Sequence, residues 1–309
     1  MDDFMLNYPV HTLDGLELLP SEFILTEESL ESIILDRGNA LPETLPLLDF
    51  GDIKADVLQL LKENPYRVIF SDERLTAFAF DLLGKVRLVL PALETINYFK
   101  TNDFYTYRHI LMVFCHSTLL AQDLVQDYKD QVQEAVAGPT HDIGKICVPL
   151  EILKKSDLLT RTDRDVLEHH TVAGYVLMSY YQQDMGGLAA RVARDHHERL
   201  DGSGYPSGTH VADPLVQIVA ASDVYDALIS RRPYRPTAYD NRTALEEMTA
   251  MAERGQLGWE VVKALISHNR RSKPHYSACK VSDEKRGTPP ADNLYGTIAR
   301  EGDEHENEP

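Results

Sequence analysis

Histidine and aspartate side chains gather in the second half of the chain at spacings that could bind metal ions. The clearest feature is the adjacent pair His141-Asp142, within the run HDIGK. Imidazole and carboxylate are ligands for divalent iron, manganese, cobalt, nickel and zinc, and an adjacent His and Asp could bind one ion or bridge two. Pro139 before the pair and Gly144 after it indicate that a helix is interrupted or begins here. Taken alone, the pair could equally be the polar end of a helix.

Two adjacent histidines form the second candidate. His196 and His197 open the run HHERLDGSGYP, at the predicted end of a helix and the start of a glycine-rich turn. Consecutive helical side chains point about 100° apart, so only one of the two would face a given metal ion. The other could serve a neighbouring ion or a substrate oxygen. A solvent-exposed histidine pair before a loop is the structural alternative.

Two aspartates lie in the apolar stretch QIVAASDVYDALIS. Asp223 and Asp226 are three residues apart and fall on one face of the predicted helix. A carboxylate placed among Ile218, Val224 and Leu228 is costly to bury unless it is paired or bound to metal. The stretch therefore indicates either a further metal ligand or buried carboxylates that cap a helix or form ion pairs.

These runs together resemble the HD-GYP family. Four motifs follow one another in that family's order and approximate spacing: HDIGK, His170 four residues before Gly174, HHExxDGSGYP, and the run from Asp223 to RPYR. They span about 95 residues, and roughly 125 when His109 is included. The resemblance implies an HD-type α-helical bundle that carries a metal centre and hydrolyses cyclic di-GMP.

The resemblance also implies two divalent metal ions, with iron first and manganese, cobalt or nickel as alternatives. Carried over position by position, the predicted ligands are His141, Asp142, His170, His196, His197 and Asp223. Asp142 would bridge the ions. His109 matches a ligand of some members, but members with three ions place a glutamate one helical turn before it, where this chain has Tyr105. His109 therefore stays open between a ligand and a core or supporting histidine, and His116 is expected to be structural or supporting.

The implied reaction converts cyclic di-GMP to pGpG, GMP or both at the binuclear site. Two cations about 3.5–4 Å apart acidify a bridging water, so that a metal-activated hydroxide attacks phosphorus in line. A histidine or a metal-bound water could protonate the leaving ribose oxygen. The predicted catalytic residues are Asp142, His141 and Lys145. The predicted substrate contacts are Lys145, Tyr205, Arg232 and Arg235. Each of these cations could instead be a surface charge, and Tyr205 of the GYP loop could be purely structural.

Two other functions remain open. The same centre could act on another cyclic dinucleotide or on a nucleotide phosphate, although the GYP loop and the RPYR run favour cyclic di-GMP. The chain could also be a weakly active or inactive cyclic di-GMP receptor, because Thr171 and Leu200 replace the proline and tryptophan usual in the family. Retention of all six ligands argues against a receptor.

The elements that would position these residues are mainly helical. Apolar residues recur at three- and four-residue spacing over 108–126, 162–182, 215–229 and 243–252. Before about residue 95, short apolar runs alternate with turn signals, and two helices are predicted near 26–37 and 54–63. We therefore predict a mainly α protein, with an HD-type α-helical bundle preceded by a small α+β domain.

The predicted domains follow these changes of pattern. They are a regulatory N-terminal domain at 1–95, an HD-GYP phosphodiesterase domain at 96–275 and an acidic tail at 276–309. From Val281 the chain holds eight acidic and three basic residues and few large apolar ones. Such a composition cannot bury enough apolar surface to fold, so we predict a disordered tail.

Composition limits the partners and the compartment. The 309 residues include 49 acidic and 31 basic side chains, a formal net charge of -18. An acidic surface repels nucleic acid and anionic membranes, so broad binding to either is not expected. Without a secretory signal or an apolar run long enough to span a bilayer, the chain is expected to be cytoplasmic. Three cysteines without a CxxC pair predict neither a disulfide framework nor a zinc knuckle, and the sequence leaves the oligomeric state and signalling partners open.

Overall fold

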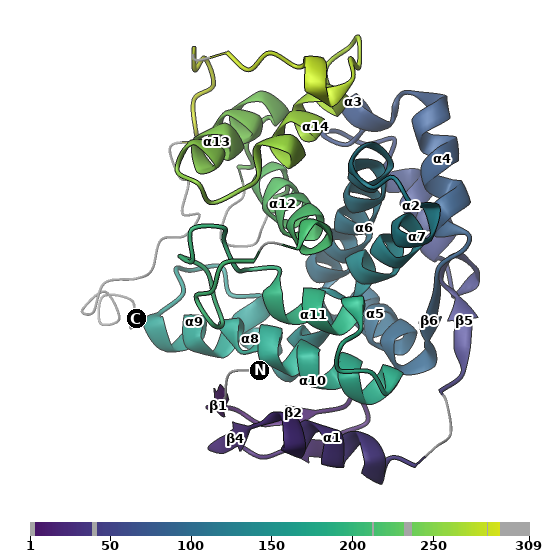
Figure 1. The fold of residues 1–309 in the computed structure, drawn as a ribbon, viewed down its shortest axis with the longest axis vertical. Coiled ribbons are helices and arrows are strands. Elements are labelled where there is room, and N and C mark those ends of the chain that lie inside the picture. Colours follow the sequence, from purple (N-terminus) through teal and green to yellow (C-terminus); the bar gives the residue numbers. More distant parts are fainter. Residues whose placement is uncertain (1–3, 39–41, 212, 232–236, 283, 291–309) are drawn as a thin grey trace, which may run out of the picture.

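Helices dominate the computed structural model of this protein, which describes residues 4–38, 42–211, 213–231, 237–282 and 284–290 (Figure 1). The strands of these described parts are β1 (Phe4–Leu6), β2 (Val10–His11), β3 (Glu17–Leu19), β4 (Phe23–Leu25), β5 (Thr44–Pro46) and β6 (Arg87–Val89). They form three antiparallel two-stranded sheets, β1 with β4, β2 with β3 and β5 with β6. The predicted mainly α fold with a small α+β region at its N-terminus is confirmed.

The helices fall into two groups along the chain. Those among and just after the first strands are α1 (Glu27–Asp36), α2 (Ile53–Leu60), α3 (Arg67–Phe70) and α4 (Glu73–Leu83). The later ones are α5 (Leu90–Asn102), α6 (Phe104–Leu124), α7 (Tyr128–Ala137), α8 (Leu150–Leu153), α9 (Arg161–Glu168), α10 (His170–Gln182), α11 (Leu188–Asp195), α12 (Pro214–Ile229), α13 (Asn241–Glu253) and α14 (Trp259–Asn269). Short 3-10 helices are η1 (Leu47–Asp49), η2 (Gly138–Thr140), η3 (Ile143–Cys147) and η4 (Tyr276–Ala278).

Side chains next to the helix ends explain where these helices start and stop. Thr26 caps α1 by accepting a hydrogen bond from the Ser29 amide, and Gly38 follows the helix with a positive φ of 84°. The periodic stretch predicted over 162–182 is divided at His169 into α9 and α10. The His170 ring and the Thr171 hydroxyl bond the carbonyls of residues 167 and 168, which compete with continued helical hydrogen bonding there.

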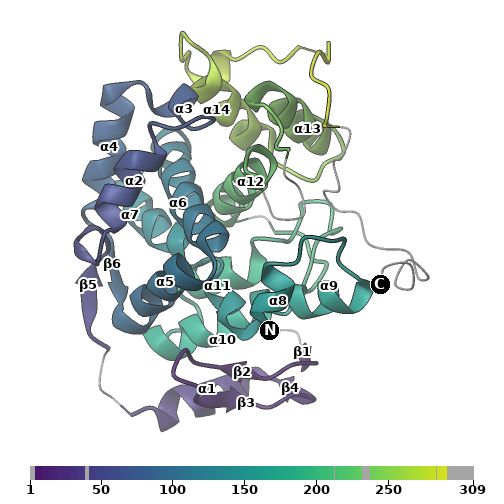
Figure 2. The same cartoon turned by 180° about the vertical axis from the view of Figure 1, so that it is seen from behind.

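The N-terminal strands share a hydrophobic core with helices of the second half. Leu6, Val10 and Leu25 belong to the same buried cluster as Ile143 of η3 and Val176 of α10. β1 to β4 and α1 accordingly lie against α10 in both views of the fold (Figure 1 and Figure 2). A larger cluster joins α4, α5 and α6 to α12, α13 and α14. Some of the metal-ligand candidates lie on elements of the larger cluster, α6 and α12, and the others lie on or next to η3, α10 and α11 of the first cluster.

The end of the described chain folds back on α13. Glu246 accepts hydrogen bonds from the backbone amides of Arg286 and Gly287, at 3.1 and 2.8 Å. Of the tail predicted to be disordered, residues 291–309 lie outside the described chain, and the domain limits at 95 and 275 stay predictions. In the parts of the chain that the structure describes, no helix has the length and apolar character needed to cross a membrane.

Candidate metal centre

Five separate stretches of the chain deliver histidine and aspartate side chains to one buried place. His109 comes from α6, the His141-Asp142 pair from the bend between η2 and η3, His170 from the first turn of α10, the 196–197 pair from the end of α11, and Asp223 from α12. The side chains of His109, His141 and His196 are fully buried, and His197 is the most exposed of the set at 18%. The structure therefore brings together all seven residues predicted as ligands or left open as one.

Two glycines explain how the HD bend comes so close to α10. A Cβ atom at Gly144 would overlap the carbonyl oxygen of His170 and the amide nitrogen of Gly174. A Cβ atom at Gly174 would in turn press on the side chain of Ala193, in α11. HDIGK and the His170–Gly174 motif are thus the two sides of one backbone contact, which sets His141 and Asp142 beside His170.

Backbone carbonyls fix the protonation of three of the rings. Nδ1 of His141 lies 2.6 Å from the carbonyl oxygen of Gly138, and Nδ1 of His196 lies 3.0 Å from that of Val192. Nδ1 of His170 bonds the carbonyl of Leu167 in the same way. Because a carbonyl oxygen can only accept, each Nδ1 carries a proton, and in the neutral form of each ring the lone pair of Nε2 is directed into the cluster.

The pKa values of the buried rings favour this neutral, ligating form. Burial lowers the pKa of His170 to about 4 and that of His196 to about 3. Burial and the neighbouring His196 also hold the pKa of His197 well below its ordinary range. Protons therefore do not compete for these lone pairs near neutral pH.

Among the described residues, Nε2 atoms of the cluster's imidazole rings lack a hydrogen-bond donor or a cation. Nε2 of His170 lies only 3.3 Å from Nε2 of His196, so two lone pairs face each other. Nε2 of His141 is buried and has no hydrogen-bond partner among the described residues. Facing lone pairs and an unpaired buried nitrogen are costly in a protein interior, and a bound divalent cation removes both costs. The donor set fits a divalent metal site.

Asp142 lies between two groups of imidazoles. Its Oδ1 is 3.5 Å from Nε2 of His170 and 3.8 Å from Nε2 of His196. Its Oδ2 is 3.3 Å from Nε2 of His141 and 3.6 Å from Nε2 of His109. Burial would raise the pKa of Asp142, but the neighbouring charge of Lys145 holds it well below its usual range. The carboxylate is thus ionised and presents one oxygen to each group.

His109 belongs to the second of these groups. Its Nε2 lies 2.9 Å from Oδ1 of Asp223, while its Nδ1 lies 2.7 Å from Oδ2 of Asp226. Asp226 is therefore not among the converging donors and instead holds the His109 ring from behind. Tyr105 stacks on a face of that ring, with centroids 5.8 Å apart and an interplanar angle of 12°. His116 lies away from the cluster, among the rings of residues 66, 70 and 225, where burial lowers its pKa to about 4.

Several known proteins are similar in sequence to this chain. Residues 109–261 match the family model described as the HD domain. A cyclic di-GMP phosphodiesterase of Thermotoga maritima is 36% identical over 216 residues, which are 69% of this chain and 56% of that protein. The cyclic di-GMP phosphodiesterase response regulator RpfG of Xanthomonas campestris is 31% identical over 279 residues, 83% of this chain and 72% of that protein. The chain belongs to the HD-GYP family.

One relative differs in its named substrate. The 3'3'-cGAMP-specific phosphodiesterase 1 of Vibrio cholerae is 31% identical over 199 residues, 63% of this chain and 45% of that protein. The chain thus spans about half the length of two of these three relatives and nearly three quarters of the third.

The residues predicted to contact substrate are only partly described. Lys145 places Nζ 2.6 Å from Oδ2 of Asp142, so its charge lies at the edge of the cluster. Tyr205 of the GYP loop stacks on the His197 ring, with centroids 4.6 Å apart and an interplanar angle of 24°. Arg232 and Arg235 lie outside the described residues.

Glu198, the third residue of the HHE run, holds the GYP loop in place, a role that the sequence did not predict. Its buried carboxylate accepts hydrogen bonds from the backbone amides of Ser207, Gly208 and Thr209, at 2.6, 3.1 and 3.2 Å. Gly204 lets the GYP loop pass directly over the carbonyl of His197, because a Cβ atom at residue 204 would overlap that carbonyl oxygen. The acidic residue next to a histidine pair and the dense glycines were the available signals.

Replacing Glu198 with alanine tests this clamp. We expect Glu198→Ala to lower the free energy of unfolding by about 2 kcal/mol, because three backbone amides lose a buried acceptor. Hydrogen exchange at residues 207–209 should become faster. Exposed Glu253, near the end of α13, provides the control: Glu253→Ala should change stability by less than about 0.5 kcal/mol. Unchanged exchange in the loop of Glu198→Ala would contradict the clamp.

Proposed function

We propose that this protein is a metal-dependent phosphodiesterase that hydrolyses cyclic di-GMP to pGpG, GMP or both. The observation that carries the proposal is the position of Asp142, whose two oxygens face two separate groups of imidazoles. Two relatives with 36% and 31% identity are named as cyclic di-GMP phosphodiesterases, and they support the substrate. The sequence motifs and the buried cluster of histidines and aspartates independently support metal-dependent phosphodiester hydrolysis.

The proposed centre holds two divalent metal ions. One group of donors is His170, His196 and His197 with Oδ1 of Asp142, and the other is His109, His141 and Asp223 with Oδ2 of Asp142. Within His170, His196 and His197, and within His109, His141 and Asp223, the donor atoms lie within 4.8 Å of one another. We therefore propose His109 as a ligand. Iron is the first candidate and manganese, cobalt and nickel are alternatives, because imidazole and carboxylate suit all four.

Each residue of the proposed site has a distinct part in the reaction. When bound, the two cations supply Lewis acidity toward the phosphate and lower the pKa of water. Asp142 and Asp223 supply the negative charge that keeps the cations in place. Lys145 supplies a positive charge at the edge of the cluster, where it can pair with a phosphate oxygen. The ring of Tyr205 offers a flat surface for a base, and Arg232 and Arg235 remain proposed phosphate contacts.

Metal affinity should increase with pH in a way that depends on His109. Burial alone lowers the pKa of His109, but hydrogen bonds with Asp223 and Asp226 outweigh it and the pKa is raised. Below that raised pKa a metal ion must displace a proton from the ring, so affinity for manganese should rise with pH up to it and then level off. Titrations between about pH 6 and pH 8 measure this slope. His109→Gln should show a shallower slope, and an identical slope would contradict the assignment.

A panel of substrates tests the proposed activity. The purified protein, loaded with Fe(II) or Mn(II), is incubated with cyclic di-GMP, with 3'3'-cGAMP and with a linear dinucleotide, and the products are separated by chromatography. We expect cyclic di-GMP to be consumed fastest. Faster consumption of 3'3'-cGAMP would instead indicate the second candidate function, hydrolysis of another cyclic dinucleotide. The similarity to the Vibrio cholerae enzyme favours that function. Tight binding of cyclic di-GMP without any product would instead make it a receptor.

The cellular setting remains part of the proposal. A role in bacterial signalling and a cytoplasmic location follow from the predicted substrate, since cyclic di-GMP is an intracellular messenger in the family that the sequence resembles. The formal net charge of -18 makes local cations necessary for holding an anionic dinucleotide. We propose that the metal ions and Lys145 supply these cations.

A further inference from the structure

A tyrosine from the N-terminal part of the chain reaches the metal centre through a buried carboxylate. Tyr66 lies between α2 and α3, outside the residues 109–261 that match the HD domain. Its hydroxyl donates to Oδ1 of Asp226 over 2.8 Å. Oδ2 of the same carboxylate lies 2.7 Å from Nδ1 of His109, whose Nε2 faces Asp223. A continuous chain of hydrogen bonds thus connects residue 66 to the proposed metal ligands.

This chain of hydrogen bonds is shielded from water along its whole length. Tyr66 is 2% exposed, Ser230 is 1% exposed, and Asp226 and His109 are fully buried. Ser230 donates to Oδ2 of Asp226 over 3.1 Å, and its oxygen lies 2.9 Å from that of Tyr66. A buried carboxylate is costly unless hydrogen bonds replace its water. The two hydroxyls and the His109 ring are those replacements.

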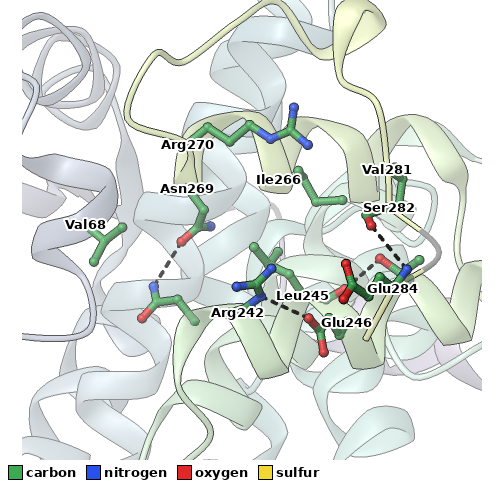
Figure 3. Close-up of a pocket in the computed structure, with 12 residues that line it drawn as sticks. Val68, Arg242, Leu245, Glu246, Ile266, Asn269, Arg270, Val281, Ser282 and Glu284 are labelled. Atoms are coloured by element: carbon green, nitrogen blue, oxygen red, sulfur yellow. Dashed lines mark hydrogen bonds and ion pairs between the residues drawn. The ribbon is translucent and has the colours of Figure 1, made fainter. Parts of the chain in front are cut away.

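The backbone around Tyr66 is tied to the helices behind the centre. The carbonyl of Pro65 accepts a hydrogen bond from Nδ2 of Asn241, which also lies 3.0 Å from Oδ1 of Asn269. Beyond Tyr66, the Ile69 carbonyl accepts from Nζ of Lys273 over 3.0 Å. The outer side of this segment borders a pocket of about 350 Å³ between α3, α13 and α14 (Figure 3). Val68 thus lines that pocket, while the hydroxyl of Tyr66 bonds Asp226.

We propose that Tyr66 is a positioning residue of the metal centre, which holds Asp226 so that the His109 ring keeps its Nε2 directed at the other donors. A carboxylate that accepts the Nδ1 proton of a metal-binding histidine fixes the ring and makes Nε2 a better donor. Tyr66 fixes that carboxylate in turn. The inference rests on the proposed metal-dependent function, and it makes a residue before the HD domain part of the centre.

The test compares two tyrosines that each donate to a buried or partly buried carboxylate. Tyr66→Phe removes the hydroxyl that reaches Asp226. Tyr107→Phe removes a hydroxyl that donates to Asp56 over 2.6 Å, and Tyr107 lies on α6, the same helix as His109. Manganese affinity of the metal-free full chain is measured by titration. We expect Tyr66→Phe to weaken it about tenfold and Tyr107→Phe to leave it within about twofold of wild type.

A double-mutant cycle shows whether the effect of Tyr66 passes through Asp226. Tyr66→Phe in an Asp226→Asn background should weaken manganese binding by no more than Asp226→Asn alone. The melting temperatures of all variants are measured alongside. We expect the melting temperatures of the two tyrosine variants to fall by similar amounts. A general loss of stability then cannot explain a difference between them in manganese affinity.

The possible outcomes separate this inference from the proposed function. Wild-type affinity in Tyr66→Phe, or independent effects of Tyr66→Phe and Asp226→Asn, would overturn the role of Tyr66 while the wild type still binds metal and hydrolyses its substrate. A wild type that binds no divalent metal would overturn the proposed function, and the inference with it.

Discussion

Asp142→Asn is expected to keep its fold and lose both the proposed metal ions and the proposed phosphodiesterase activity. The amide has the shape of the carboxylate but carries no charge, so it cannot bridge two cations. The two oxygens of Asp142 face both groups of histidines, so both proposed metal sites lose a ligand. We expect metal content to fall from about two ions per chain to below one, and turnover to fall on the order of a thousandfold.

Matched controls make that result specific. Asp165→Asn makes the same chemical change on the exposed surface of α9 and should leave metal content and turnover at wild-type values. Metal content is measured by elemental analysis after gel filtration, and folding by circular dichroism. An Asp142→Asn protein that retained two ions and normal turnover would remove the bridging carboxylate from the account.

Gly144→Ala is expected to have the largest effect on stability. Its Cβ would overlap backbone atoms of His170 and Gly174, and neither of these can move away like the end of a flexible side chain. We expect the free energy of unfolding to fall by about 3 kcal/mol or more, because η3 and α10 must separate. His141 and Asp142 would move away from His170 as a result, so the remaining folded protein should also bind metal more weakly.

Gly186→Ala is the control for that experiment. A Cβ at Gly186 would meet nothing closer than 3.6 Å and the residue has no positive φ, so this variant should unfold at nearly the wild-type denaturant concentration. Urea denaturation of the two variants side by side gives the comparison. Equal stability of Gly144→Ala and Gly186→Ala would mean that the HD bend and α10 are not in the close contact described.

The metal ligands were accessible from sequence because the family's motifs are local and ordered. HDIGK, His170, the histidine pair and Asp223 each lie in a run that carries its own signal, and the structure brings all of them together. Their roles as ligands stay a proposal. The helical fold was predictable for a related reason, since the three- and four-residue apolar spacing marks buried helix faces. The break at His169 was not, because it depends on side-chain donors competing for backbone carbonyls.

Contacts between distant parts of the chain were beyond the reach of sequence reasoning. His109 and Asp226 are 117 positions apart, and only the packing of α6 on α12 decides that one orients the other. Tyr66 is 160 positions from Asp226 and lies well before the histidine and aspartate motifs of the second half of the chain. Glu198 was visible within its motif, but its role depends on amides nine to eleven residues later.

An anomalous-scattering measurement on crystals loaded with Mn(II) tests the central claim most directly. We expect two manganese peaks inside the cluster, both next to the carboxylate of Asp142. One should contact Nε2 of His170 and His196, and the other should contact Nε2 of His109 and His141. Peaks found only at surface carboxylates, with none in contact with Asp142, would contradict the proposed metal centre.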